Sequence, residues 1–160
     1  MAQNRNKEGI IIYTDGSSMG NPGPGGYGIV LISPKHNLRK ELSAGFKKTT
    51  NNRMELMAVC VALESLKLKN TPVTLYSDSK YVVDAVEKGW LWGWQKKGFK
   101  DKKNPDLWQR FIKAYKNHQV KFVWVKGHAG NPENERCDQL AVEAGQQPNL
   151  ADDIGYLENK

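Results

Sequence analysis

The chain carries two kinds of hydrophobic pattern: short runs of β-branched and aromatic residues, and longer stretches with apolar residues at helical spacing. The short runs predict five strands, at residues 10–14, 27–33, 40–46, 73–76 and 120–125. A turn at Pro34 to Asn37 separates the second strand from the third. Three consecutive strands with short connections are typical of an antiparallel meander.

The helical stretches predict four helices, at residues 54–67 and 81–86, from Pro105 or Asp106 onward, and from Pro132 to about Gly145. The first is apolar nearly all round, so we expect a central, mostly buried helix that is capped by Asn51 or Asn52. Ser77 or Ser79 is the expected cap of the second helix, and Asn131 is that of the last.

The order of these elements predicts an α/β (α+β) fold with a five-stranded mixed sheet, three strands antiparallel and two parallel, flanked by helices. The last two strands each follow a helix, so we expect them to be parallel crossovers. We expect a single domain at residues 9–145, with a flexible N-terminal tail at 1–8 and a loose C-terminal tail at 146–160.

Composition narrows the class of protein. The 160 residues are 39% hydrophobic and 26% charged, close to the values of globular domains. No run approaches the roughly 18 apolar residues of a membrane span, and no apolar segment follows the basic N-terminus as in a secretion signal. Cys60 and Cys137 alone cannot form a disulfide scaffold or a zinc site. We therefore expect a reduced, cytoplasmic monomer with no membrane contact and no obligate protein partner.

The positive charge is unevenly distributed. Lys and Arg total 24 against 17 Asp and Glu, a net charge of +7, and five of the lysines lie within residues 95–103. Three tryptophans, Trp90, Trp92 and Trp94, precede them. Lysines interleaved with aromatic side chains are typical of surfaces that bind a sugar-phosphate backbone, which indicates an anionic partner. The same composition also fits a solvated loop above packed tryptophans.

A glycine-rich segment gives a misleading signal. Residues 23–28 match G-x-G-x-x-G, the fingerprint of dinucleotide-binding proteins. That fingerprint requires a helix N-terminus to follow it, so that backbone amides meet a pyrophosphate. A predicted strand follows here, and prolines interrupt the segment, so we interpret it as a glycine-rich β-turn.

Two acids follow predicted strands. Asp15 comes directly after the first strand, and alternation places it on the same face as Ile11 and Tyr13. Asp78 comes at the end of the fourth strand. If these strands are parallel neighbours, both carboxylates lie at the carboxyl end of the sheet, where open α/β sheets bind ligands. Taken singly, each acid also fits a helix cap or a turn.

Two further acids lie on predicted helices. Glu55 begins the buried helix, where an acid can also stabilise the helix dipole. Asp138 lies about 100° around the last helix from Cys137, at the edge of its apolar stripe. Four acids that converge from four elements repel one another unless a cation lies between them. Mg²⁺ is a hard ion that favours oxygen ligands.

Five motifs occur in order along the chain: YTDGS at 13–17, GNPGPGG at 20–26, TNNRMEL at 50–56, SDS at 77–79 and VKGHAGNPENERCD at 125–138. Each is weak alone. In this order and on these elements they resemble the signatures of type 1 ribonuclease H, over residues 9–145. The resemblance implies a ribonuclease H-like fold. It also implies an endonuclease that hydrolyses the RNA strand of RNA–DNA hybrids and leaves 5′-phosphate and 3′-hydroxyl ends.

The resemblance implies roles for the four acids. By this analogy Asp15, Glu55, Asp78 and Asp138 are metal-binding catalytic carboxylates that hold two Mg²⁺ ions, for which Mn²⁺ can substitute. Two such ions activate the attacking water and stabilise the leaving 3′-oxygen of an in-line displacement. His128 matches the family's proton-transfer or product-release histidine, a task that suits an imidazole near neutral pH.

Further positions match substrate contacts of the family. Asn21, Asn51 and Asn52 match positions that read the backbone and minor groove of the hybrid, where the 2′-hydroxyl distinguishes RNA from DNA. An amide can pair with that hydroxyl as donor or as acceptor. Weaker candidates, for phosphate contacts, are Thr50, Asn104 and Lys126.

The segment at 90–103 resembles the basic protrusion of the family, which grips the DNA strand beyond the cut. Its expected contacts are Trp90, Trp94, Lys96, Lys97 and Lys100. The segment is shorter than in some bacterial members, which implies lower affinity for the hybrid. Lys80 stands where relatives often carry glutamine, so we expect a phosphate contact there in place of a contact to a base edge.

Two other functions stay open at this point. A non-catalytic module that binds nucleic acid would lack at least one acid, whereas all four candidates are present. Another polynucleotidyl transferase of the same architecture, such as an integrase or a junction resolvase, would share the acids but not the asparagine loops and the basic segment together. A metal-dependent endonuclease for RNA–DNA hybrids is therefore the leading prediction.

Overall fold

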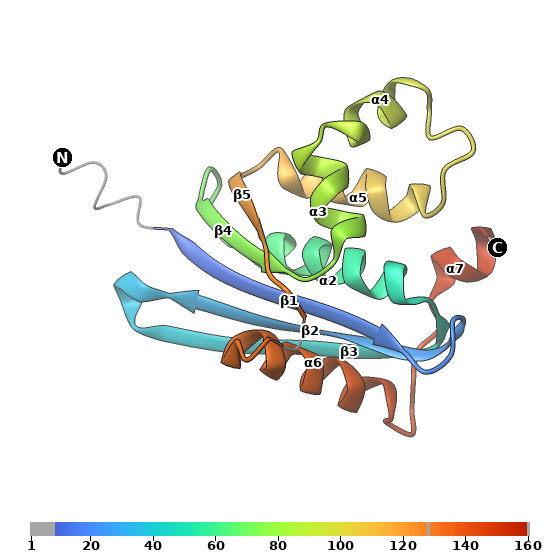
Figure 1. Cartoon of the computed structure of the whole chain (residues 1–160), viewed down its shortest axis with the longest axis horizontal. Coiled ribbons are helices and arrows are strands. Elements are labelled where there is room, and N and C mark those ends of the chain that lie inside the picture. The colour runs from blue at the N-terminus through green and yellow to red at the C-terminus, as the bar shows by residue number, and fades with distance from the viewer. Residues whose placement is uncertain (1–8, 128, 160) are drawn as a thin grey trace.

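A five-stranded mixed sheet is the centre of the computed structural model, which describes residues 9–127 and 129–159 (Figure 1). Its strands are β1 (Ile10–Ser18), β2 (Gly23–Ser33), β3 (Leu38–Thr49), β4 (Pro72–Ser77) and β5 (Gln119–Trp124). They lie in the order β3-β2-β1-β4-β5. β2 pairs antiparallel with β1 and β3, whereas β4 pairs parallel with β1 and β5. The mixed sheet predicted from the sequence is confirmed.

Helices cover both faces of this sheet (Figure 1). On one face, α6 (Pro132–Gly145) packs against β1, β2 and β3. On the other, α2 (Asn51–Glu64) packs against β1 and β2 and contacts α5 (Pro105–Tyr115). The remaining helices are α3 (Lys80–Glu87), α4 (Trp90–Lys96), α7 (Ile154–Asn159) and the short 3₁₀ helix η1 (Pro34–His36). Among the described residues, no helix combines the length and the apolar composition that crossing a membrane requires.

The central helix α2 is buried as predicted, with most of its residues in the core. Its cap differs from the prediction. The Thr50 hydroxyl accepts a hydrogen bond from the backbone N–H of Arg53 at 3.2 Å, so Asn51 and Asn52 lie inside the first turn. Neither asparagine caps the helix, and both side chains lie at the surface.

The glycine-rich segment is a strand, and our interpretation of it as a turn is wrong. Residues 23–28 form the start of β2, and two of their glycines, Gly26 and Gly28, face the backbone of α6. A Cβ at Gly28 would lie 2.2 Å from the Cys137 carbonyl oxygen, and one at Gly26 would lie 2.6 Å from that of Ala141. Glycine therefore permits the close approach of helix and sheet, which a turn pattern cannot reveal.

The C-terminal tail is docked on the domain, contrary to the loose tail that we expect from the sequence. Ala151 pairs with Phe46 of β3 in an isolated bridge. Asp153 is buried and accepts hydrogen bonds from Arg53 Nε at 2.8 Å and from the Thr49 hydroxyl at 2.7 Å. The tail is thus held by polar contacts between residues about 100 positions apart in the sequence. Such contacts leave no hydrophobic periodicity in the sequence of the tail, so a local pattern does not predict them.

Replacing Asp153 with Ala is expected to lower the free energy of unfolding by about 3–5 kcal/mol, because it leaves the buried guanidinium of Arg53 with Asp106 as its one remaining carboxylate partner. Urea unfolding followed by circular dichroism measures this change. Asp152→Ala is the matched control, since Asp152 is exposed and lies 3.8 Å from Lys47 in a surface pair worth about 1 kcal/mol or less. Equal losses in the two variants would contradict the role given to Asp153.

Candidate active site

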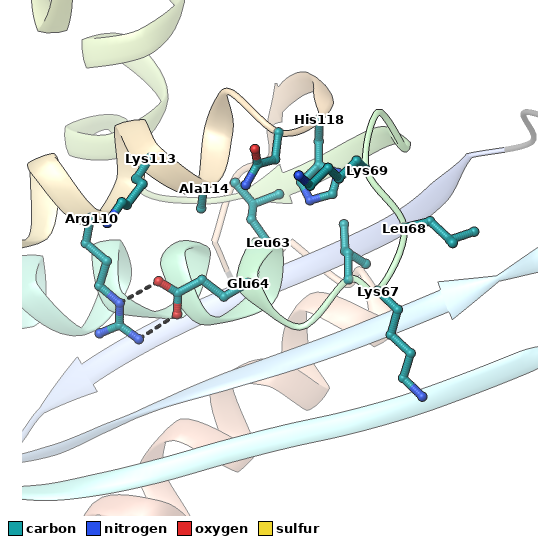
Figure 2. A pocket seen from close by; sticks show the side chains of 11 residues that line it. Leu63, Glu64, Lys67, Leu68, Lys69, Arg110, Lys113, Ala114 and His118 are labelled. Carbon is teal, nitrogen blue, oxygen red and sulfur yellow. Dashed lines mark hydrogen bonds and ion pairs between the residues drawn. The ribbon is translucent and has the colours of Figure 1, made fainter.

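A basic cavity of about 290 Å³ opens between the C-terminal end of α2 and α5 (Figure 2). Lysines such as Lys67 and Lys113 line it, and its carboxylate, Glu64, is paired with Arg110 at 2.7 Å. The cavity lies at the amino end of β4, and none of its described lining residues offers an unpaired carboxylate. It therefore does not suit the metal chemistry predicted from the sequence.

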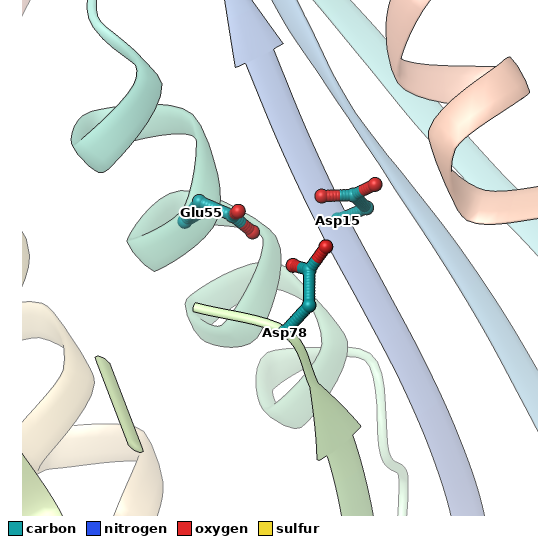
Figure 3. Close-up of side chains that lie close together, drawn as sticks. All are labelled: Asp15, Glu55 and Asp78. Carbon is teal, nitrogen blue, oxygen red and sulfur yellow. The ribbon is translucent and has the colours of Figure 1, made fainter. Parts of the chain in front are cut away.

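Three of the predicted acids meet at the opposite end of the sheet (Figure 3). Asp15 lies within β1, which runs four residues farther than the alternating pattern predicts, and Asp78 follows the neighbouring parallel strand β4. Glu55 extends toward them from α2. One carboxylate oxygen from each acid lies within 4.8 Å of those from the other two.

A single glycine brings Glu55 to this position. Gly16 lies beside Asp15 in β1 and faces α2. A Cβ at Gly16 would lie 2.3 Å from the Met54 carbonyl carbon and 2.4 Å from the Glu55 nitrogen. Any side chain there would push α2 away from β1, so the absence of one lets Glu55 reach the acids of the sheet.

Burial and mutual repulsion disfavour the charged forms of these acids. Asp15 is 5% exposed, and its burial, together with the charge of Asp78, raises its pKa to about 8. Burial also raises the pKa of Glu55 well above its ordinary value, and the charges of Asp15 and Asp78 add to that effect. The Gly16 N–H donates to Asp15 Oδ1 at 2.8 Å and favours the ionised form.

The cluster fits a divalent cation. Glu55 Oε1 and Asp78 Oδ1 are buried and have no hydrogen-bond partner among the described residues. No ion pair between described side chains includes Asp15, Glu55 or Asp78. Buried oxygens without a donor are costly, and carboxylates are the ligands that Mg²⁺ prefers. These residues can therefore hold a hard metal ion.

Asp138, the fourth predicted acid, lies outside this group of three. Asp138 is half-buried on α6, and its charge contributes to the raised pKa of Asp15. It is close enough to act on the cluster but does not share its tight spacing. Gly127 faces Asp78, since a Cβ there would lie 2.8 Å from Asp78 Oδ2. His128 falls outside the described residues.

The predicted asparagines divide into two groups. Asn21 and Asn51 are exposed and linked, because the backbone N–H of Asn51 donates to Asn21 Oδ1 at 2.9 Å. Asn52 is exposed beside them in the first turn of α2. Asn104, by contrast, accepts from Arg53 and donates to the Tyr81 hydroxyl, both within the domain. Its amide therefore has structural partners at both ends.

Lys80 is exposed at the start of α3, close to the acids. Its ammonium lies 4.9 Å from the centre of the Trp124 ring, and the indole N–H of Trp124 donates to the Asp78 carbonyl at 3.2 Å. Sequence reasoning missed Trp124, which is 43% exposed. Its place at the carboxyl end of a predicted strand, beside the acids of the neighbouring strand, was the available signal.

The basic segment begins as a helix, α4, that was not predicted, and continues as a loop. In Figure 1, α4 stands away from the sheet beyond α3. Trp90 is 49% exposed, whereas Trp94 is half-buried and packs edge-on against Trp108 at 5.7 Å. All five lysines of the segment are exposed, among them the predicted contacts Lys96, Lys97 and Lys100. Trp94 is therefore part of the packing of the domain, whereas Trp90 is part of its exposed surface.

Comparison with known sequences gives a consistent result. The family model RNase H matches residues 7–146. The chain is 60% identical to a ribonuclease H of Desulforamulus reducens over 157 residues, which covers 95% of this chain and 97% of that protein. It is 53% identical to a ribonuclease HI of Synechocystis over 150 residues, which covers 90% and 92% of the two chains.

Solved structures are similar in fold. LC9-RNase H1, a type 1 RNase H with the type 2 active-site motif, has a TM-score of 0.76 and 34% identity, covering 85% of this chain and 71% of that one. LC11-RNase H1 in complex with an RNA/DNA hybrid has a TM-score of 0.63 and 32% identity, covering 84% and 95%. The sequence matches extend over nearly the whole chain and include the strands and helix that carry the acids, so this chain belongs to the RNase H family.

Proposed function

We propose that this protein is an endonuclease that hydrolyses the RNA strand of RNA–DNA hybrids and leaves 5′-phosphate and 3′-hydroxyl ends. The observation that carries the proposal is the convergence of Asp15, Glu55 and Asp78 in a chain of the RNase H family. A similar structure, that of LC11-RNase H1, contains an RNA/DNA hybrid. The net charge of +7 favours such a polyanionic substrate.

Metal ions are part of this proposal. Asp15, Glu55 and Asp78, with Asp138 as the fourth ligand, would hold two Mg²⁺ ions, or Mn²⁺ in their place. Ions bound there supply an activated water and stabilise the leaving 3′-oxygen. The chain's own contribution is to hold the carboxylate oxygens in position, as the Gly16 N–H does for Asp15.

Three groups of residues would place the hybrid. The exposed lysines of the segment at 90–103, with Trp90 and Trp94, contact the DNA strand, and Lys80 with Lys126 contacts phosphates near the cut. Asn21, Asn51 and Asn52 contact the RNA strand. Thr50 and Asn104 are engaged in capping and in the Arg53 cluster, so they would support these contacts through the fold. His128 would transfer a proton or assist product release.

We further propose that the protein acts in the cytoplasm as a monomer without an obligate partner. Both cysteines are free and buried, which suits a reducing compartment. The proposed catalytic groups all come from one chain, so the site does not need a second copy to be complete.

The protein is expected to cut a labelled RNA strand annealed to DNA in the presence of Mg²⁺, and to leave the same strand intact when it is annealed to RNA or is free. EDTA should stop the reaction, because the carboxylates alone supply no activated water. Asp15→Asn is expected to abolish cutting while hybrid binding persists, which excludes a contaminating nuclease. Tight hybrid binding without cutting by the unaltered protein would instead favour a binding module.

Metal-free protein is expected to lose stability as the pH rises from 5 to 9. Folding raises the pKa of Asp15 from 3.8 to about 8, so the folded chain keeps a proton that the unfolded chain has released. This stabilisation is complete below about pH 4 and is lost as the pH passes through about 8. Asp15→Asn has no such proton, so its melting temperature in EDTA should exceed that of the unaltered protein at pH 9 and decline less with pH. An equally steep decline in both proteins would contradict the repulsion within the cluster.

Replacing Lys96, Lys97 and Lys100 with Ala is expected to weaken hybrid binding and flatten its dependence on salt. Each lost phosphate contact removes roughly 0.9 from the slope of log K against log salt concentration, so three contacts remove about 2.7 at most. Fluorescence anisotropy in EDTA over a range of salt concentrations measures the slope.

A matched control for this experiment changes three lysines around the cavity of Figure 2, which lies at the other end of β4. Replacing Lys67, Lys69 and Lys113 with Ala makes the same change in net charge. The salt slope of this variant should stay close to that of the unaltered protein. If both triple variants reduce the slope alike, net charge and not the segment at 90–103 accounts for binding.

A further inference from the structure

Trp124, at the end of β5, contacts both the backbone of Asp78 and the side chain of Lys80. β5 pairs parallel with β4, so Trp124 lies opposite Ser77, the residue before Asp78. The indole N–H of Trp124 donates to the Asp78 carbonyl oxygen at 3.2 Å. The ring is therefore attached to the connection between β4 and α3, beside one of the three clustered acids.

The ring holds a lysine without neutralising its charge. The Lys80 ammonium lies 4.9 Å from the centre of the Trp124 ring, as in a cation–π interaction. Lys80 is exposed, and within the described parts of the chain its side chain forms no ion pair. Asp78, two residues earlier, has a carboxylate oxygen without a hydrogen-bond partner among those residues, so a lysine without another contact would be attracted to it. An aromatic partner leaves the positive charge available to an anion.

We propose that Trp124 is a positioning residue that holds the Lys80 ammonium beside the acids and directs it to one phosphate of the hybrid. A lysine side chain loses conformational entropy when it binds a phosphate, and a ring that already restricts that side chain reduces the loss. The inference rests on the proposed function, because it assigns how one phosphate contact of that site is made. Trp124 then acts through Lys80 and not by stacking on a base or a sugar.

A double-mutant cycle tests whether Trp124 acts through Lys80. Hybrid binding is followed in EDTA, where no cutting interferes. Trp124→Leu keeps an apolar side chain but removes the ring, so the dissociation constant should rise about 2- to 5-fold, the factor by which one exposed cation–π contact favours the positioned rotamer. In the Lys80→Ala background the same change should leave the dissociation constant unaltered, because the ammonium that the ring holds is absent.

Lys121→Ala is the matched control for this cycle. Lys121 is exposed on the same strand, three residues before Trp124, and its loss changes the net charge as the loss of Lys80 does. Trp124→Leu should therefore raise the dissociation constant by the same factor in the Lys121→Ala background as in the unaltered protein. Urea unfolding of each variant checks that it is folded.

The second test locates the phosphate. Hybrids with one uncharged methylphosphonate linkage, moved along either strand, show at which phosphate the unaltered protein and Lys80→Ala differ. At that linkage the loss of affinity should be full in the unaltered protein, smaller in Trp124→Leu and absent in Lys80→Ala, because a weakened contact has less to lose. Losses at the other linkages should be equal in the three proteins.

Two results overturn the proposal. One is an equal rise of the dissociation constant on Trp124→Leu with and without Lys80, which would show that the indole acts on the Asp78 backbone or contacts the hybrid itself. The other is a methylphosphonate penalty that stays full in Trp124→Leu. Either result leaves the proposed function intact if the unaltered protein cuts the hybrid in Mg²⁺, whereas failure of the unaltered protein to cut overturns the proposed function separately.

Discussion

The close packing of α2 against β1 is the constraint on which the functional arrangement depends. Gly16 permits it, because a Cβ there would lie 2.3 Å from the backbone of Met54. Three residues at the start of α2 then serve three parts of the molecule. Asn51 contacts the loop after β1, Arg53 holds the C-terminal tail, and Glu55 extends to the acids of the sheet. A shift of this helix would disturb the site, the loop and the tail together.

Buried charge is compensated at Arg53, but not at Glu55 two residues later in the same turn of α2. Arg53 is 1% exposed, but Asp106 and Asp153 each bind it through two nitrogens, so its charge is compensated within the chain. Asp15 and Glu55 have no cationic partner in any ion pair of the described residues, and burial raises the pKa of both. The uncompensated acids lower the stability of the folded chain but leave carboxylate oxygens available as ligands. A cation that binds the folded chain there would raise its stability by mass action.

Local patterns were sufficient to predict the five strands, how they pair, and helices α2, α3, α5 and α6, because alternation and helical spacing are properties of neighbouring residues, but they did not predict α4 or α7. They could not set element ends that depend on distant partners. β1 continues to Ser18 because its pairing with β2 extends as far as Gly25. The tail lacks an apolar period, and its anchor is the polar contact of Asp153 with Arg53. The sequence of the glycine-rich start of β2 is typical of a turn, and the close packing of α6 against Gly26 and Gly28 is what explains the glycines there.

The motifs identified the residue types of the site but not the direction of each group within it. They associate Asp138 with the other acids, yet three acids share the tight cluster and Asp138 acts on Asp15 from outside it. They leave an asparagine free to donate or accept, and the contacts of Ser18 remove that freedom at Asn51. The lysines that we propose to bind phosphates and the asparagines that we propose to contact the RNA strand lie on separate elements. Under the proposed function, affinity for the hybrid would therefore change with the length of the basic segment, while the choice of RNA over DNA would stay with the loop after β1 and the start of α2.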